Sequence, residues 1–286
     1  MIVVTGASGA VGRRVAERLT ARGERIRLFA RDASRVPDIP GAEVATGSYE
    51  DPASLDAAMR GASTVFVVSA GGEPVKRSRL HANAIDAAAR AGASHVVYLS
   101  FQGASSESRF PYGVDHALSE KHLRLAGVPF TVLRDSLYLD IIPHLFGADG
   151  VVRGPAGDGR TAWVARDDVA DVAAAVLANP APHAGAVLDV TGPEATTYGE
   201  VAAQLSELTG RALRYENETI AEAKRSRAAF GAPDWEVDVW LGSYAAAAAG
   251  ELAGVSDTVE RLAGHPPLDL RAFAARYPEW LAPLRG

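Results

Sequence analysis

The chain has 286 residues, 48% of them hydrophobic, and a formal net charge of −6 with both signs interspersed. This length suits one large α/β domain or a domain with a smaller lobe, and the charge argues against nucleic acid or an anionic membrane as the main partner. The sequence has no cysteine, which excludes a disulfide framework and a thiolate metal site or nucleophile.

A glycine-rich turn follows the first expected strand. Gly6, Gly9 and Gly12 lie between a β-branched run at residues 2–4 and an expected helix at residues 11–22, which is the context that a dinucleotide-binding fingerprint requires. Gly6 permits a tight turn, Gly9 has no Cβ to obstruct a pyrophosphate, and Gly12 allows the helix to pack closely on the strand. The helix N-terminus adds free N–H groups and a partial positive charge. The residues expected at the pyrophosphate are Thr5, Gly6, Ala7, Ser8, Gly9, Ala10, Val11 and Gly12.

Strands and helices then alternate along the chain. The expected strands cover residues 25–30, 42–45, 64–69, 94–100 and 129–133, and the expected helices begin at Asp51-Pro52 and cover residues 74–91 and 115–126. Such alternation implies right-handed βαβ crossovers and a doubly wound parallel sheet of the Rossmann-like α/β class. Ligands bind such a sheet beyond the carboxyl ends of its strands, which points to Arg31, Ser69, Ser100 and Arg134.

After residue 133 the alternation becomes weaker. A short apolar helix is expected at residues 138–146, a turn-rich loop at 154–159, an alanine-rich helix at 167–178, a strand at 186–190 and a helix with a capping box at 197–208. Beyond residue 210 no strand pattern is evident, and the aromatic and alanine-rich segment around residues 235–249 suggests helices. We therefore divide the chain into a Rossmann domain of residues 1–134 and 159–190 and a small, mainly helical substrate lobe of residues 135–158 and 191–286.

The end of the second strand distinguishes the two nicotinamide cofactors. An acidic residue at this point binds the ribose 2′-hydroxyl, whereas an arginine suits a 2′-phosphate. Arg31 occupies this strand end and Asp32 follows it, while Arg13 and Arg14 open the neighbouring helix. We expect NADPH to be preferred over NADH, the alternative being that these arginines form a solvated charged face.

Several segments in order along the chain resemble one known family. They are T5-G-A-S-G-A-V-G12, F29-A-R-D32, S48-Y-E-D-P-A-S-L55, H95-V-V-Y-L-S100, L133-R-D-S-L-Y138, A156-G-D-G159, A165-R-D-D-V-A-D171 and L188-D-V-T-G192. This set is similar to the NmrA-like family, a branch of the atypical short-chain dehydrogenase/reductases, over nearly the whole length. It most resembles the type 2 NAD(P)H:quinone oxidoreductases.

The resemblance implies a cofactor that lies across the sheet and a substrate in the cleft between the two lobes. By motif position, Arg31 would hold the 2′-phosphate, residues 69–71 would pass beneath the ribose, and residues 135–138 would lie near the nicotinamide with Arg166 nearby. Beyond the glycine turn and Arg31, the expected cofactor contacts are Ser69, Ala70, Gly71, Ser100, Asp135, Ser136 and Tyr138. The sequence departs from the family pattern at Ser48 and Asp135, where members often have Asp and Asn.

The sequence offers no clear catalytic acid. Typical short-chain dehydrogenases use a Tyr-x-x-x-Lys pair, in which the lysine lowers the tyrosine pKa, but none of the three lysines lies four residues after a tyrosine. His116 follows Tyr112 at this spacing and is at most a weak substitute. A quinone can accept hydride with little acid catalysis, because the hydroquinone anion is weakly basic, provided that it stacks over the nicotinamide.

Four residues are candidates to line the substrate pocket, and one of them is also a weak catalytic candidate. They are Tyr138, Arg166, Trp235 and Tyr244, with Tyr138 joining Tyr112 and His116 as the weak catalytic candidates. The simpler interpretation of each aromatic is a core side chain. The histidines show no metal-ligand spacing and no G-x-S-x-G elbow is present, so neither a metal site nor a serine nucleophile is expected.

The sequence therefore predicts an NADPH-dependent oxidoreductase that passes hydride directly to a small molecule, a quinone by resemblance, without metal or flavin. Two alternatives remain open: a redox sensor that binds NAD(P) and a protein partner without turnover, and a reductase or epimerase of another ligand. A homodimer also remains open. No apolar run approaches the ~20 residues of a membrane span, and the chain opens directly with a strand, so we expect a cytoplasmic protein without a cleaved signal.

Overall fold

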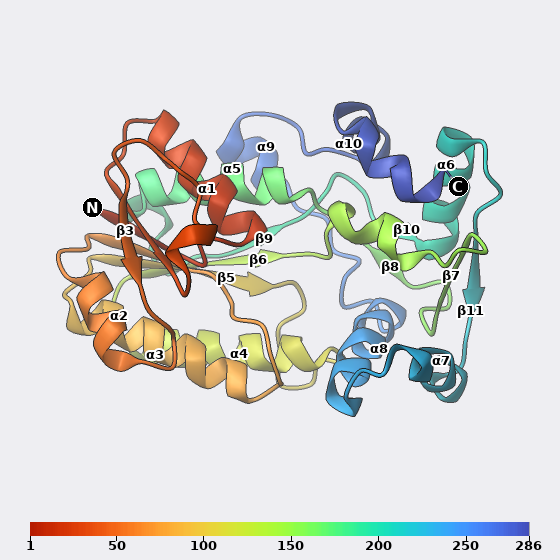
Figure 1. Ribbon diagram of the computed structural model, residues 1–286, viewed down its shortest axis with the longest axis horizontal. Helices are drawn as coiled ribbons and strands as arrows, with labels where there is room; N and C mark the ends of the chain where they lie inside the picture. The colour runs from red at the N-terminus through yellow and green to blue at the C-terminus, as the bar shows by residue number, and fades with distance from the viewer. Residues whose placement is uncertain (286) are drawn as a thin grey trace.

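Seven parallel strands form the central sheet of the computed structural model, which describes residues 1–285 (Figure 1). The strands are β1 (Ile2–Thr5), β2 (Ile26–Ala30), β3 (Glu43–Thr46), β4 (Thr64–Val67), β5 (His95–Phe101), β6 (Phe130–Asp135) and β9 (Val187–Val190). Their order in the sheet is β3-β2-β1-β4-β5-β6-β9, and every neighbouring pair is parallel. The strand order reverses between β1 and β4, which is where a doubly wound sheet binds its ligand. The predicted Rossmann-like sheet is confirmed.

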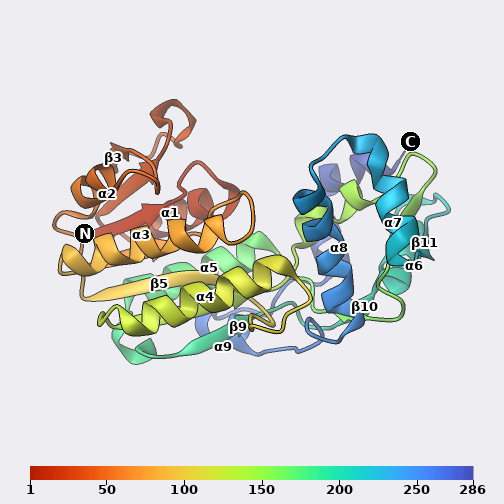
Figure 2. The same cartoon turned by 90° about the horizontal axis from the view of Figure 1, so that it is seen from below.

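Helices cover both faces of this sheet (Figures 1 and 2). One face packs on α1 (Ala10–Ala21), α5 (Arg166–Ala178) and α9 (Thr258–Ala263), and the other on α2 (Pro52–Met59), α3 (Lys76–Arg90) and α4 (Pro111–Leu125). Val4 belongs to the first core and Val3 to the second, because successive side chains of a strand point to opposite faces. A strand buried on both faces therefore has the continuous apolar run found at residues 2–4.

A smaller lobe lies beyond one end of the sheet (Figure 2). Its helices are α6 (Tyr198–Thr209), α7 (Ile220–Arg227), α8 (Asp234–Ala248) and α10 (Leu270–Arg276), with 3₁₀ segments η2 (Leu139–Leu145), η4 (Ala228–Phe230) and η5 (Pro278–Leu284). Of the remaining 3₁₀ segments, η1 (Ala33–Arg35) follows β2 and η3 (Ala181–His183) precedes β9. The lobe is mainly helical, as expected. No helix within residues 1–285 has both the length and the apolar character that crossing a bilayer requires.

The lobe also contains four short strands that the sequence does not predict. β7 (Val151–Gly154) pairs in parallel with β11 (Arg214–Asn217), and β8 (Arg160–Thr161) pairs antiparallel with β10 (Thr196–Thr197). Each has only two to four residues. β11 is largely exposed, so it shows no alternation of apolar and polar residues that could mark a strand.

The boundary between the two cores differs from the expected division in two places. Val259 of α9 is buried in the core of the sheet domain against α5, and the Ser256 hydroxyl donates to the backbone oxygen of Asp189 at 2.6 Å. The expected division placed both residues in the lobe. Conversely, Trp163 and Ala165, which were expected in the Rossmann domain, are buried in the core of the lobe. Apart from these segments, the division stays a prediction.

The close approach of α1 to β1 depends on two glycines. Gly6 has a φ of +61°, the left-handed conformation that glycine adopts without strain. A Cβ at Gly12 would lie 2.4 Å from the carbonyl oxygen of Gly6 and 2.8 Å from its carbonyl carbon. These atoms are backbone, so they cannot yield as the end of a flexible side chain would.

We expect Gly12→Ala to lower the free energy of unfolding by about 1–3 kcal/mol, because the added methyl group forces α1 away from the turn. The matched control is Gly199→Ala in α6, where the nearest atom to a new Cβ is 3.7 Å away. Alanine is favoured over glycine in a helix, so this control should be neutral or stabilising by up to about 1 kcal/mol. Urea denaturation of both variants checks the difference, and equal effects would contradict the packing argument.

Candidate cofactor and substrate site

The glycine turn presents backbone rather than side chains at the carboxyl end of β1. Gly9 is exposed and is the N-cap of α1, without a side-chain cap. The N–H groups of the first turn therefore have no partner within the helix and remain available to an anion. A Cβ at Gly9 would meet only the Gly6 oxygen, at 3.2 Å, so the space above it is open. The turn has the form that a pyrophosphate requires.

Three of the residues expected at the pyrophosphate have side chains turned away from this opening. Thr5, Ala7 and Val11 are buried, and the Thr5 hydroxyl donates to the backbone oxygen of Phe66 at 2.8 Å and accepts from the backbone N–H of Val68 at 2.9 Å. Their side chains therefore hold β1 against β4 and α1. Any contact that they make with a ligand is therefore through the backbone.

At the end of β2, the acidic residue Asp32 has a hydrogen-bond partner, whereas the basic residue Arg31 has none among residues 1–285. Asp32 caps η1: its carboxylate accepts from the backbone N–H of Ser34 at 2.9 Å and from its hydroxyl at 2.7 Å, and these hydrogen bonds lower the pKa of Asp32. Arg31 is exposed and has no side-chain hydrogen bond or ion pair to any residue in the described range 1–285. The charged side chain available to a ligand at this strand end is therefore the cationic guanidinium of Arg31.

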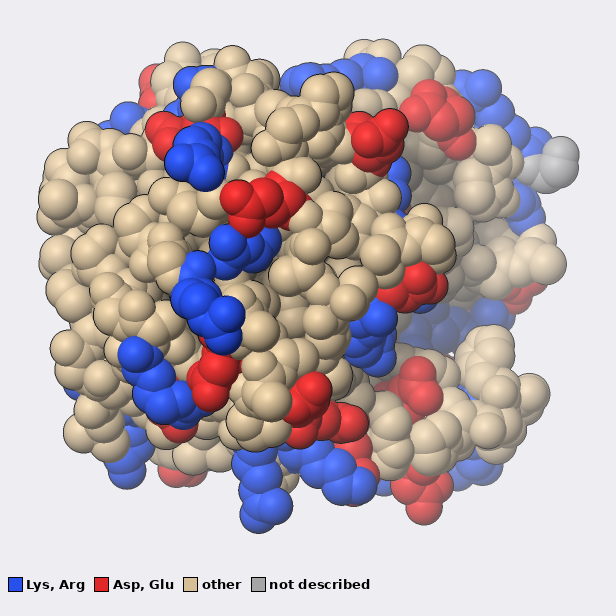
Figure 3. All heavy atoms as spheres, turned by 60° about the vertical axis from the view of Figure 1, so that its left-hand side comes forward, with Lys and Arg blue, Asp and Glu red and all other residues tan. Residues whose placement is uncertain are grey.

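The two arginines at the start of α1 differ from each other. Arg14 donates to the backbone oxygen of Ala10 and lies 3.7 Å from Asp140 and 3.4 Å from Asp167, so it ties α1 to η2 and α5. Arg13 is exposed. Over the face of the molecule in Figure 3, basic and acidic side chains are interspersed rather than gathered in a patch of one sign.

The loop between β4 and α3, expected beneath the ribose, is held by hydrogen bonds between its backbone and side chains of α3 and α4. The backbone N–H of Ala70 donates to Nε2 of His81 at 2.8 Å, and Nε of Arg77 donates to the backbone oxygen of Ala70 at 2.6 Å. Val75 has a φ of +70°, which is unusual for a β-branched residue. Its N–H donates to Asp115 at 2.7 Å. The residues of the loop itself, Ser69, Ala70 and Gly71, are half-buried or exposed at the carboxyl end of β4.

A buried polar network underlies this loop. The Tyr98 hydroxyl lies 3.0 Å from Nδ1 of His81 and 2.9 Å from Nδ1 of His116, and Ser119 lies 2.8 Å from Nδ1 of His81. Burial, with a contribution from Arg77, lowers the pKa of His81 to about 3, and burial holds the pKa of His116 well below its usual value. Both rings are therefore neutral, and they act as fixed hydrogen-bonding groups rather than as acids.

The structure does not bring Tyr112 and His116 together as a catalytic pair. The Tyr112 hydroxyl donates to the backbone oxygen of Gly72 at 2.8 Å, and its ring lies 3.6 Å from the guanidinium of Arg77, whereas His116 faces Tyr98. α4 begins at Pro111 rather than at Asp115, because proline at the first helical position favours that start. Both residues help to hold the β4–α3 loop.

Ser100, expected near the cofactor, points into the protein. It is buried and donates to Glu120 of α4 at 2.7 Å, while Arg134 donates to the same carboxylate at 2.8 Å through two nitrogens. Burial opposes ionisation of Glu120, but the hydrogen bonds from Arg134 and Ser100 outweigh it and lower the pKa. These three residues join β5, β6 and α4, and Ser100 has no side-chain group left for a ligand.

The segment after β6 contains a second group of buried polar residues. The Tyr138 hydroxyl donates to Oδ2 of Asp135, and the guanidinium of Arg166 lies 4.4 Å from the centre of the Tyr138 ring. Burial raises the pKa of Asp135 to about 7, although Tyr138 and Arg166 both act to lower it. The Ser136 hydroxyl oxygen is buried without a hydrogen-bond partner within residues 1–285. The structure thus brings together the predicted residues Asp135, Tyr138 and Arg166.

The lobe contains a cavity of about 460 Å³, lined in part by η2, the segment that follows Tyr138 in the chain. Its apolar and aromatic lining comes from η2, β7, η4 and α8, namely Ile141, Leu145, Val151, Phe230, Trp240 and Tyr244. Arg153 and Arg227 also line it, but they are paired with Asp149 at 2.7 Å and with Glu218 at 2.9 Å. The cavity is therefore mainly apolar, as small-molecule sites are.

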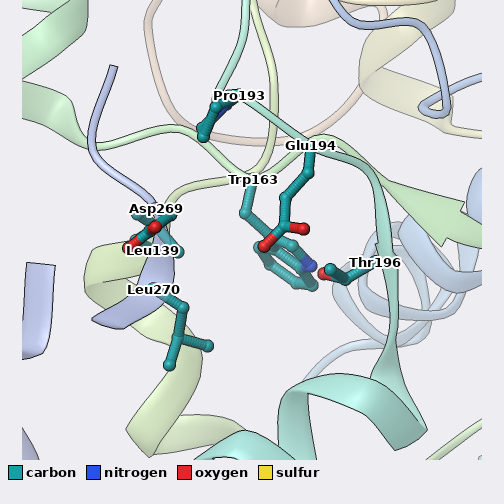
Figure 4. Close-up of a pocket in the computed structure, with 7 residues that line it drawn as sticks. All are labelled: Leu139, Trp163, Pro193, Glu194, Thr196, Asp269 and Leu270. Carbon is teal, nitrogen blue, oxygen red and sulfur yellow. The ribbon is translucent and has the colours of Figure 1, made fainter. Parts of the chain in front are cut away.

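Of the three expected aromatics, Tyr138, Trp235 and Tyr244, only Tyr244 lines this cavity. Tyr244 lines it and stacks on Tyr198, with ring centres 4.8 Å apart. Trp235 instead packs against the core of the lobe. A second hollow beside Trp163 (Figure 4) has a volume of only about 10 Å³, which is room for about one water molecule. Of these two hollows, only the larger has room for a substrate.

The side chains that hold the β4–α3 loop in place could not be identified from the sequence. Arg77, His81, Tyr98 and Asp115 come from three elements, and nothing in their spacing pairs them. The only available signal is that Tyr98 is polar within the otherwise apolar run of residues 96–99. A hydroxyl in a strand buried on both faces must find a partner.

Comparisons with known proteins identify the family of the chain. Residues 6–180 match the family described as NAD(P)H-binding. The (4-alkanoyl-5-oxo-2,5-dihydrofuran-3-yl)methyl phosphate reductase of Streptomyces griseus is 37% identical over 99% of this chain and 100% of its own length. Quinone oxidoreductase 2 of Escherichia coli is 32% identical over 94% of this chain and 96% of its own.

Solved structures of similar proteins lead to the same family. The NADPH complex of the Escherichia coli quinone oxidoreductase superposes with a TM-score of 0.88, at 31% identity, over 97% of this chain and 99% of that one. The NADP(H) complex of triphenylmethane reductase from Citrobacter superposes with a TM-score of 0.87, at 28% identity, over 96% and 99%. The chain therefore belongs to the NAD(P)H-binding family, as an NmrA-like atypical short-chain dehydrogenase/reductase resembling quinone oxidoreductase 2, and is an NAD(P)H-dependent oxidoreductase.

Proposed function

We propose that this oxidoreductase uses NADPH and passes its hydride directly to a quinone. The observation that carries the cofactor preference is the unpaired guanidinium of Arg31 at the end of β2, next to an Asp32 whose carboxylate is bound to Ser34. An arginine at this position suits a 2′-phosphate. The NADPH complex of the Escherichia coli relative supports the same cofactor.

The residues of the site fit this cofactor. The exposed Gly9 and the uncapped start of α1 offer backbone N–H groups to the pyrophosphate, and the half-buried β4–α3 loop offers a surface for the ribose. When bound, NADPH supplies a hydride from its nicotinamide ring. Asp135 ends β6, Ser136 and Tyr138 follow it at the same edge of the sheet, and the three would bound the nicotinamide side.

The shape and polarity of the lobe cavity support a flat, apolar acceptor. The cavity of about 460 Å³ has Phe230, Trp240 and Tyr244 in its lining, and its two arginines are neutralised by acidic partners. A quinone stacked over the nicotinamide needs orientation more than charge stabilisation. Tyr138 and Arg166 would lie where such a ring passes from the cavity to the cofactor.

A second substrate class is favoured by one comparison. The Streptomyces griseus relative, at 37% identity, is named as a reductase of an alkanoyl furanone phosphate. That compound, like a quinone, is an electron-poor conjugated carbonyl compound. His144 is an exposed residue of the cavity lining and would face the phosphate of such a substrate. Both classes share the hydride step and differ in the polar end of the acceptor.

The proposed activity is tested by following NADPH oxidation with purified protein. Simple benzoquinones and naphthoquinones should be reduced, and a conjugated furanone without a quinone ring should be reduced more slowly. NADPH binding is measured in parallel by calorimetry. Tight NADPH binding without reduction of any quinone would contradict the proposal, and faster reduction of the furanone would favour the second class.

We expect NADPH to bind more tightly than NADH, and Arg31→Ala to abolish most of that difference. Loss of a charge-assisted phosphate contact costs about 1.5–3 kcal/mol, which corresponds to roughly tenfold or more in affinity. The control is Arg22→Ala, an exposed arginine at the opposite end of α1. Titration of both cofactors checks the ratio, and a wild type that binds both equally would rule out the role of Arg31.

A further inference from the structure

We propose that Asp135 and Tyr138 form the proton donor for the reduced substrate, an inference that rests on the proposed hydride transfer to a quinone. The chain lacks the Tyr-x-x-x-Lys pair, and the Tyr112 and His116 side chains are engaged elsewhere. Asp135 ends β6 at the carboxyl edge of the sheet, and Tyr138 directly precedes η2, whose residues Ile141 and Leu145 line the cavity in the lobe.

Asp135 is held rigidly. It is the last residue of β6, and β6 pairs with β5 on one side and with β9 on the other. Its backbone oxygen accepts from the N–H of Gln102 at 2.7 Å. Its side chain is nearly inaccessible, with 5% of the residue exposed, and Oδ2 accepts from the Tyr138 hydroxyl. Tyr138 is more exposed than Asp135, so it is the member of the pair that can meet a substrate.

Few charges face this pair. Arg166, at the start of α5, places its guanidinium over the Tyr138 ring and 3.4 Å from Asp140 of η2, and it makes no hydrogen bond to Asp135 in the described chain. Arg14 of α1 is likewise directed at Asp140 and Asp167. The Asp135 carboxyl therefore has no direct cationic partner to stabilise its ionised form.

This environment keeps a proton on the carboxyl near neutral pH. Burial raises the pKa of Asp135 to about 7 and places that of Tyr138 well above its usual value. With the carboxyl protonated, the short contact between the two groups can run from Asp135 to Tyr138, which frees the phenolic hydrogen to turn towards a substrate. A protonated buried carboxyl is a suitable general acid at the working pH.

The proposed step balances as follows. As the quinone accepts the hydride, an electron pair moves onto a carbonyl oxygen, the Tyr138 hydroxyl gives its proton to that oxygen, and Asp135 gives its proton to Tyr138. The Asp135 carboxylate then regains a proton from solvent. One quinone, one NADPH and one proton give one hydroquinone and one NADP⁺.

The test compares two acceptors that differ in their need for a proton. A quinone needs one, whereas a cationic triphenylmethane dye is a carbocation that becomes neutral on taking up hydride alone. The variants are Asp135→Asn and Tyr138→Phe, which keep the size of each side chain. The control is Asp189→Asn, a carboxyl on the neighbouring strand whose pKa is also raised by burial. The kcat for each acceptor is measured from pH 5.5 to 9.

In the wild type, the kcat for the quinone should fall as the pH rises through about 7, while the kcat for the dye should not follow this titration. Asp135→Asn should lower the quinone kcat by roughly 10²-fold below pH 7 and remove the pH dependence. Tyr138→Phe should lower it similarly. The dye kcat should change by less than about threefold in either variant, and Asp189→Asn should behave as the wild type.

Two results would overturn the inference while leaving hydride transfer intact. One is a quinone kcat in Asp135→Asn that equals that of the wild type; the other is a parallel loss with both acceptors, which would mean that the pair only positions the substrate. A wild type that binds NADPH but reduces neither acceptor would overturn the proposed function and the proton donor together.

Discussion

The site depends on how closely α1 approaches the end of β1. Backbone atoms of Gly6 occupy the space that a side chain at Gly12 would need, so only glycine lets the helix start directly above the strand. This closeness exposes the first N–H groups of α1 at the point where the strand order reverses between the neighbouring strands β1 and β4. Thr5 reinforces the arrangement through hydrogen bonds with the backbone of Phe66 and Val68 in the β4 segment, and these contacts shape the turn at which we propose that the pyrophosphate binds.

Most arginines around the carboxyl edge of the sheet are paired with acidic residues, and this pattern bears on which cofactor the site suits. Arg14 is directed at acids of η2 and α5, Arg77 lies 3.3 Å from Asp115, and Arg134 is bound to Glu120. Arg31 has no such partner within residues 1–285. Asp135 presents the converse case, since it is a buried carboxyl without a direct cationic partner. An unpaired cation at one end of the expected cofactor position, and a buried carboxyl with a raised pKa at the other, suit NADPH and a hydride acceptor that needs a proton.

The sequence predicted the sheet, the glycine turn and the position of Arg31 because each depends on residues close together in the chain. It did not predict that Ser100 points to Glu120, or that His81 and Tyr98 support the β4–α3 loop, because these contacts join residues from different elements. The lobe was least predictable: its strands are too short to show a period. In the sequence, Asp135 was notable only as a departure from a family pattern. Its burial and its hydrogen bond with Tyr138 are what suggest a role in proton donation.

The central claim is that NADPH lies across the carboxyl edge of the sheet, with its 2′-phosphate at Arg31 and its nicotinamide beside Tyr138. A crystal structure of the protein with NADP⁺ tests it most directly. We expect the guanidinium of Arg31 within hydrogen-bonding distance of the 2′-phosphate, the pyrophosphate on the N–H groups that follow Gly9, and the nicotinamide facing the Asp135–Tyr138 pair. A cofactor bound with its phosphate away from Arg31, or with its nicotinamide turned away from Tyr138, would contradict the account.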